Sequence, residues 1–224
     1  MTMSRRLYRA VKRLRNSTFR KLSHGDLIKK LLTEDINALK KKSAVFVETG
    51  CGISTVSLAE VGKKIGATVY SCDYNSKKAD ELKSAMPDQI SGVNFMIGDS
   101  LESLAKIAEK QAEIDFLFLD SAASAMHTFK EFLIMEKCLH PGSRVLVDNA
   151  AIPGVKRVLS PVRKGKILVP YLLASPFWEV KDYPEAGDSM VAAIMRSQAD
   201  YADPDYEDPE YIDNWRALFK KKLS

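Results

Sequence analysis

Three short polar motifs each follow an apolar run, and their residue types suit the binding of a nucleotide-like ligand. The first is Glu48-Thr49-Gly50-Cys51-Gly52-Ile53-Ser54, the second begins at Asp73, and the third is Gly98-Asp99-Ser100. Glycines let the chain turn sharply and let a ligand approach the backbone, while a following helix offers free N–H groups. A carboxylate at position 73, about 20 residues beyond the glycines, can accept hydrogen bonds from both hydroxyls of a ribose.

Each motif also has a purely structural interpretation. The glycines fit an ordinary tight turn, and Asp73 and Asp99 fit turn or helix-cap positions. A dinucleotide oxidoreductase is disfavoured, because its G-x-G-x-x-G pattern requires glycine where this chain has Thr55. The three motifs are more specific together, because they follow three successive strands and therefore share the carboxyl edge of a sheet.

A second group of oxygen-bearing side chains follows two later apolar runs. Asp120 ends the run that starts at residue 114, and Asp148 with Asn149 ends the run that starts at residue 144. In a parallel sheet these strand ends lie side by side, so the three side chains can converge on one point. Two carboxylates and an amide oxygen are hard ligands that suit Mg²⁺. The sequence therefore predicts a metal site formed by Asp120, Asp148 and Asn149.

The elements that must position these motifs alternate between strand and helix. Strands are expected at 44–48, 67–73, 93–97, 114–120 and 144–148, and helices at 54–65, 76–86, 101–110 and 126–138. Near-continuous apolar strands separated by helices predict a parallel sheet with helices on both faces. Two more strand-like runs, 177–183 and 189–196, fit an antiparallel hairpin at the sheet edge. The expected fold class is α/β: a doubly wound, Rossmann-like sheet, mostly parallel, with an antiparallel C-terminal hairpin.

The 224 residues fit one large domain flanked by two segments of opposite charge. Residues 1–42 contain thirteen Lys/Arg and three Asp/Glu, a net charge of +10, so the other 182 residues carry −5 of the total of +5. The stretch 200–213 holds seven acidic residues and no basic one. We expect basic helices over 1–43 that act as a lid, a ligand-binding domain over 44–197, and an acidic tail with a helix over 198–224. The domain itself lacks the charge pattern of a nucleic-acid binder.

Cysteine content and hydropathy bear on the compartment. Cys51, Cys72 and Cys138 cannot form a fully paired disulfide framework and fit a reducing compartment, so we expect a cytoplasmic protein. No apolar run approaches the roughly 18 residues of a membrane-spanning helix. The first 23 residues lack any acid, which leaves a mitochondrial presequence and a membrane-surface or nucleic-acid contact as alternatives to a packed helix.

On these motifs the chain resembles the class I S-adenosylmethionine-dependent methyltransferases. More narrowly, it resembles the catechol O-methyltransferase branch of the metal-dependent O-methyltransferases. The resemblance runs from about residue 24 to residue 196. It includes Gly25-Asp26 at the start of a helix, Glu48-x-Gly50 with Ser54 in the glycine loop, and Asp148-Asn149 followed by Pro153-Gly154.

The resemblance implies roles for the motif residues. It assigns Glu48, Gly50 and the adjoining Gly52 to the methionine part of the cofactor, Ser54 to its carboxylate, Asp73 to the ribose, and Tyr74, Asp99 and Ser100 to the adenine end. It makes Asp120 both a cofactor-binding residue and a catalytic residue. It also implies a Mg²⁺ on Asp120, Asp148 and Asn149 that binds two adjacent substrate oxygens. Many metal-free methyltransferases carry an acid after the fourth strand, so a metal-free site is the alternative.

One position departs from the branch that the chain resembles. The branch has a lysine general base three residues after its first metal-ligand Asp, where this chain has Ala123. A methyl group cannot take a proton. The base must lie elsewhere, or a metal alone must acidify the substrate, or the substrate is not a catechol-like diol. His127 is the nearest replacement and His24 is a second, although both also fit ordinary structural roles.

The sequence therefore predicts an S-adenosylmethionine-dependent methyltransferase. The expected reaction is Mg²⁺-assisted O-methylation of a small-molecule acceptor, with Asp120 and His127 as catalytic residues. We expect no membrane span and no nucleic-acid partner, and a homodimer is left open. Two alternatives remain: methylation of RNA or protein with the basic N-terminus as a docking arm, and a non-catalytic cofactor-binding homologue that has lost its base.

Overall fold

The structure, a computed structural model, describes residues 23–34, 44–150, 163–183, 186 and 190–196. The strands are β1 (Val45–Thr49), β2 (Thr68–Asp73), β3 (Val93–Ile97), β4 (Ile114–Leu119), β5 (Leu139–Val147), β6 (Trp178–Tyr183) and β7 (Met190–Met195). The helices are α2 (His24–Thr33), α3 (Ile53–Ile65), α4 (Ser76–Ala85), α5 (Ser100–Lys110), α6 (Ala125–Glu136) and α7 (Gly165–Ala174).

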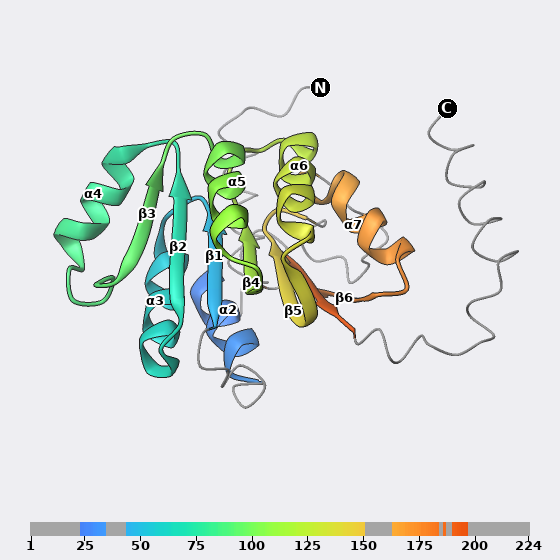
Figure 1. The fold of residues 1–224 in the computed structure, drawn as a ribbon, viewed down its shortest axis with the longest axis horizontal. Helices are drawn as coiled ribbons and strands as arrows, with labels where there is room; N and C mark the ends of the chain where they lie inside the picture. Colours follow the sequence, from blue (N-terminus) through green and yellow to red (C-terminus); the bar gives the residue numbers. More distant parts are fainter. Residues whose placement is uncertain (1–22, 35–43, 151–162, 184–185, 187–189, 197–224) are drawn as a thin grey trace, which may run out of the picture.

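All seven strands belong to one sheet in the order β3-β2-β1-β4-β5-β7-β6 (Figure 1). The first five strands are parallel, whereas β7 runs antiparallel to β5 and β6 runs antiparallel to β7. The central strands β1 and β4 are buried along their whole length, which is why their sequences are nearly continuous apolar runs. The expected α/β fold with an antiparallel C-terminal hairpin is confirmed.

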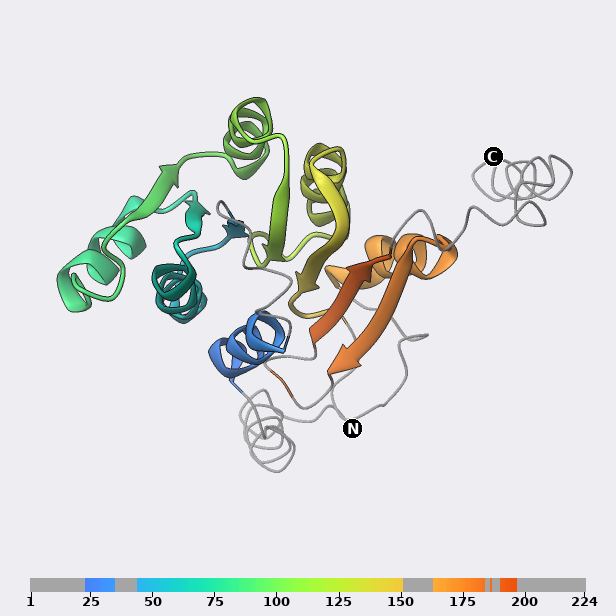
Figure 2. The same ribbon diagram turned by 60° about the horizontal axis from the view of Figure 1, so that its bottom comes forward.

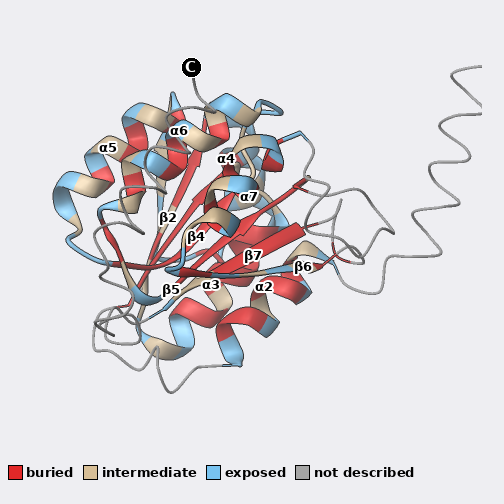
Figure 3. Cartoon of the chain, turned by 90° about the vertical axis from the view of Figure 1, so that its right-hand side faces the viewer, coloured by how far each residue is buried: buried red, intermediate tan, exposed pale blue. Residues whose placement is uncertain are grey.

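Helices cover both faces of the sheet (Figures 1 and 2). Successive residues of a strand point to opposite faces, so Phe46 packs in the cluster with α2 and α3, while Val47 packs in the cluster with α5, α6 and α7. Figure 3 shows the consequence: the central strands are buried, and the helices are buried on the side that meets the sheet, whereas the edge strands β3 and β6 are partly exposed. Helix α2 contributes Leu27, Ile28, Leu31 and Leu32 to the core, each at most 2% exposed.

The register of the parallel strands aligns their carboxyl ends. Thr49 pairs with both Cys72 and Leu119, and Leu119 pairs with Val147. The residues that follow these strands therefore start their loops at one edge of the sheet. This register is what brings the polar motifs together.

Helix α7 was not expected from the sequence. Its run GKILVPYLLA contains Pro170, a residue that disfavours helix interiors because it lacks an N–H and clashes with the preceding turn. Leu168, Val169 and Leu172 are nevertheless fully buried against the sheet.

Several expectations concern segments outside the described residues. These are the basic segment apart from α2, the Pro153-Gly154 turn, and the acidic tail with its expected helix over 198–224. In the described part of the chain, every helix is too short or too polar to cross a membrane.

Candidate active site

The glycine loop is fixed by a close approach between the ends of β1 and β4. Gly50 has φ +91°, a conformation that favours glycine, and its N–H donates to the carbonyl of Cys72 at 2.7 Å. A Cβ on Gly50 would lie 2.4 Å from the carbonyl oxygen of Asp120. Glycine is therefore required here because the loop backbone lies directly against the end of β4.

Asp73 lies at the end of β2 and faces this loop. One carboxylate oxygen accepts the N–H of Asn75 at 2.8 Å, and the other accepts the N–H of Cys51 at 3.0 Å and contacts the Lys78 ammonium at 3.1 Å. Burial alone would raise the pKa of Asp73, but these hydrogen bonds and the lysine hold it below the usual value. The group therefore stays ionised and can accept hydrogen bonds.

A cavity of about 320 Å³ opens at this edge of the sheet. Its lining comes from the end of β2, from the loops after β1 to β4 and from the first turns of α4, α5 and α6: Gly50, Cys72, Asp73, Tyr74, Lys78, Gly98, Asp99, Ser100, Asp120, Ser121, Ala122 and His127. Six of the residues expected to bind cofactor are among them. Glu48, Gly52 and Ser54 are not in this lining.

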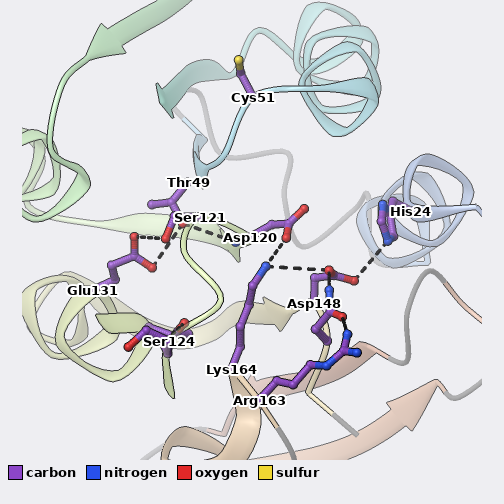
Figure 4. Close-up of polar contacts among 12 residues, drawn as sticks. His24, Thr49, Cys51, Asp120, Ser121, Ser124, Glu131, Asp148, Arg163 and Lys164 are labelled. Atoms are coloured by element: carbon purple, nitrogen blue, oxygen red, sulfur yellow. Dashed lines mark hydrogen bonds and ion pairs between the residues drawn. The ribbon is translucent and has the colours of Figure 1, made fainter. Parts of the chain in front are cut away.

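At the ends of β4 and β5, the same edge holds a pair of acids bridged by a lysine (Figure 4). The ammonium of Lys164 contacts Asp120 Oδ1 directly and lies 3.8 Å from Asp148 Oδ2. Lys164 and Asp148 are 4% and 2% exposed, whereas the Asp120 side chain is 27% exposed. Burial, followed by the charge of Asp148, raises the pKa of Asp120. Burial acts in the same direction on Asp148, but His24 and Lys164 lower its pKa overall.

Residues 47–150, from β1 to the loop after β5, match the family described as "Methyltransferase domain". The match covers the strands whose ends line the cavity. These residues carry a methyltransferase domain. The expected class of enzyme is confirmed. No curated protein matches the sequence.

Solved structures share the fold of this methyltransferase at low sequence identity. The O-methyltransferase TomG from Streptomyces achromogenes, in complex with SAM, is 20% identical, with a TM-score of 0.60 over 77% of this chain and 79% of that chain. An O-methyltransferase from Bacillus cereus, in complex with SAH, is 17% identical, with a TM-score of 0.56 over 88% and 93%. An SAH-bound methyltransferase from Podospora anserina is 15% identical, with a TM-score of 0.52 over 88% and 98%.

His24 lies beside the acid pair because of how α2 begins. Ser23 and Asp26 form a reciprocal capping box that starts the helix at His24. Gly25 packs so closely on α3 that a Cβ there would lie 2.4 Å from the Ser57 hydroxyl oxygen. The His24 Nε2 atom lies 3.0 Å from Asp148 Oδ1. Of the two histidines considered as replacement bases, His24 is the one that contacts the acid pair.

His127 lies on a different wall of the cavity. Its Nε2 atom is 2.8 Å from the Ser100 hydroxyl and 3.3 Å from Glu131 Oε1. Glu131 is fully buried and also accepts hydrogen bonds from Ser121, at 2.6 Å, and from Thr49, at 3.3 Å (Figure 4). These contacts tie α6 to the ends of β1 and β4. They place His127 with the residues expected at the adenine end, and its catalytic role stays a prediction.

The predicted Mg²⁺ ligands converge, but their present arrangement does not fit the metal. The position between the two carboxylates holds the Lys164 ammonium. The third expected ligand, Asn149 Oδ1, accepts a hydrogen bond from Arg163, and the Asn149 amide nitrogen donates to Asp148. Among the described residues, no group of three or more His, Cys, Asp or Glu is arranged to hold a metal ion. This arrangement does not support the predicted metal site of Asp120, Asp148 and Asn149, which stays a prediction.

Lys164 and Glu131 are among the residues of this site that sequence reasoning missed. Glu131 could have been noticed as an acid on the sheet-facing side of the helix expected at 126–138. Lys164 had no local signal, because the helix that it precedes was itself not expected.

All three cysteines are buried and unpaired, and burial raises the pKa of the Cys51 thiol to about 12, so nothing suggests a nucleophile.

Glu48 supports the glycine loop from beneath. It is fully buried, and its Oε1 atom accepts hydrogen bonds from Ser71 at 2.7 Å and from Thr55, whereas Oε2 has no hydrogen-bond partner among the described residues. Burial raises the pKa of this carboxyl to about 7 from an ordinary value of 4.5. The folded chain therefore binds one more proton than the unfolded chain between these two pH values. The free energy of unfolding falls as pH rises through that window.

Glu48→Gln should remove this pH dependence, because glutamine has no charge to bury and its oxygen can accept the same two bonds. Wild type should lose stability relative to the variant as the pH rises. We expect the difference in the free energy of unfolding, variant minus wild type, to increase by roughly 3 kcal/mol between pH 4.5 and a pH above 7. Urea denaturation at a series of pH values measures it. The control is Glu109→Gln, an exposed glutamate on α5. A difference that stays constant with pH would show that folding leaves the pKa of Glu48 unchanged.

Proposed function

We propose that this methyltransferase transfers the methyl group of S-adenosylmethionine to an oxygen atom of a small-molecule acceptor. The observation that carries the proposal is the exposed side of Asp120. It lines the cofactor-sized cavity and belongs to the acid pair at the ends of β4 and β5. A donor site and an oxygen-rich acceptor site therefore share one edge. The names of TomG and the Bacillus cereus enzyme, both O-methyltransferases, support oxygen as the acceptor atom.

In this proposal the cavity residues divide between cofactor and acceptor. Asp73 binds the ribose hydroxyls, Tyr74 and the Asp99-Ser100 turn lie at the adenine end, and the loop at Gly50 lies at the methionine end. Asp120 accepts a hydrogen bond from the acceptor hydroxyl and orients its oxygen toward the sulfonium methyl group. Methyl transfer is an in-line displacement, so alignment of donor and acceptor is the main contribution required of the protein.

The reaction is derived without Mg²⁺, because the acid pair is already bridged by a lysine. His24, on the far side of Asp148, is a further candidate for contact with the acceptor. The cytoplasmic location and the homodimer stay predictions. The Ala123 departure keeps a non-catalytic homologue as the alternative, and the basic segment 1–22, outside the described residues, keeps an RNA or protein acceptor as another.

The test is release of S-adenosylhomocysteine from S-adenosylmethionine by the full chain. A panel of small phenols, alcohols and carboxylic acids forms one arm, and total RNA and a basic protein form two others. We expect turnover with a small hydroxylated acceptor and a loss of at least tenfold in Asp120→Asn. Asp88→Asn, an exposed aspartate away from the cavity, is the control. Turnover only with RNA or protein would contradict the small-molecule proposal. Cofactor binding with no turnover in any arm would favour the non-catalytic alternative.

A further inference from the structure

We propose that Lys164 is a built-in cation that takes the place of a divalent metal between Asp120 and Asp148. The chain then holds its acid pair in position without Mg²⁺. The proposal rests on the proposed function in one respect only: it takes the sheet edge at Asp120 and Asp148 to be the place where the methyl acceptor binds. The position of the ammonium is a property of the chain itself.

The first argument is where the charge lies. The Lys164 ammonium contacts one oxygen of Asp120 and lies 3.8 Å from one oxygen of Asp148 (Figure 4). A divalent metal ion bound by the same two carboxylates would lie at the same point as the ammonium, because each cation is attracted to the position closest to both negative charges. An ammonium and a divalent ion cannot occupy that point together. Binding of a metal would therefore require Lys164 to leave.

The second argument is that other cationic or hydrogen-donating groups already lie beside two of the remaining oxygens. Asp148 Oδ1 lies 3.0 Å from His24 Nε2, and Asn149 Oδ1 accepts a hydrogen bond from the Arg163 guanidinium. A metal that used these two oxygens as ligands would therefore have to displace His24 and Arg163. Arg163 and Asn149 both have positive φ, at 47° and 53°. The backbone adopts this rare conformation on both sides of the contact.

The third argument is that the fold fixes Lys164 in place. The next residue, Gly165, begins α7, and a Cβ there would lie 2.3 Å from the carbonyl oxygen of Ala150 and 2.7 Å from its Cα atom. The start of α7 is therefore packed against the backbone just beyond Asn149. Lys164 is 4% exposed, which is rare for a lysine unless its charge is paired. Lys164 is thus a positioning residue that acts through Asp120 and Asp148.

Binding of Mn²⁺, a paramagnetic substitute for Mg²⁺, tests this inference by electron paramagnetic resonance on the full chain. Wild type is expected to bind no stoichiometric Mn²⁺. Lys164→Met keeps the length of the side chain and removes its charge, so it should bind one equivalent at least tenfold more tightly than wild type. Lys164→Arg, which keeps a cation, and Lys166→Met, an exposed lysine in the first turn of α7, should behave as wild type.

Adding Asp148→Asn to Lys164→Met should abolish the gained binding, which would locate the ion at the acid pair. Two results would overturn the inference: one equivalent of Mn²⁺ on wild type that Asp148→Asn removes, or a folded Lys164→Met chain that gains no Mn²⁺. If circular dichroism shows that Lys164→Met is unfolded, the wild-type titration decides. Stoichiometric binding then overturns the inference, and its absence at millimolar Mn²⁺ supports it. Failure to find any methyl acceptor would contradict the proposed function and leave this result standing.

Discussion

Asp73→Ala is expected to weaken binding of S-adenosylmethionine by at least tenfold. The substitution removes an ionised acceptor that is 7% exposed and lines the cavity. A hydrogen bond to a charged group contributes roughly 1.5–3 kcal/mol, which corresponds to roughly a 10- to 150-fold change in the dissociation constant. Calorimetry with S-adenosylmethionine or S-adenosylhomocysteine measures this change. An unaltered dissociation constant in a folded Asp73→Ala chain would refute the ribose assignment.

Two further variants separate ribose binding from loop support by Asp73. Asp73→Asn keeps an oxygen that can still accept the Asn75 N–H, so it should retain the loop and lose only part of the affinity. Lys78→Ala removes the ammonium that lies 3.1 Å from the carboxylate but leaves the acceptor in place. We expect Lys78→Ala to bind the cofactor no more than a few-fold more weakly than wild type. If Lys78→Ala were as weak as Asp73→Ala, the ion pair and not the ribose contact would explain the loss.

Gly50→Ala is expected to destabilise the fold and to abolish cofactor binding at ordinary concentrations. An alanine at φ +91° costs roughly 1–2 kcal/mol in backbone strain. Its methyl group would also lie 2.4 Å from the carbonyl oxygen of Asp120 and 2.9 Å from the carbonyl carbon. Relieving that clash must separate the ends of β1 and β4, and overpacking of this kind costs roughly 1–3 kcal/mol. Thermal unfolding and calorimetry measure the two effects.

Gly52→Ala is the matched control, because it adds the same methyl group two residues along the same loop. Gly52 has an extended backbone, with φ 174°, and a Cβ there would meet no atom within 4 Å. The control should keep its stability to within about 1 kcal/mol. Equal stability losses in both variants would mean that the loop tolerates no side chain at all. The close approach to Asp120 would then lose its special role.

The sequence alone determined which loops form the site. Apolar runs such as 114–119 are buried on both faces, so they had to be central parallel strands. The carboxyl ends of parallel strands share one edge. Asp73 ends a strand, and Asp99, Asp120 and Asp148 follow one within two residues, so their common position required no tertiary information. The hairpin of β6 and β7 was predictable for a similar local reason, since two strand-like runs were joined by a short turn.

Only the tertiary structure decided what lies between the acids. Lys164 is 44 residues from Asp120 in the chain, and it belongs to an element that Pro170 made hard to predict. Its position depends on the packing of Gly165 against Ala150, a backbone contact that leaves no periodic pattern in the sequence. Three oxygen ligands therefore predicted a metal, because residue types report which groups are available and not which cation reaches them. That choice is made by packing, which brought an ammonium to the acid pair.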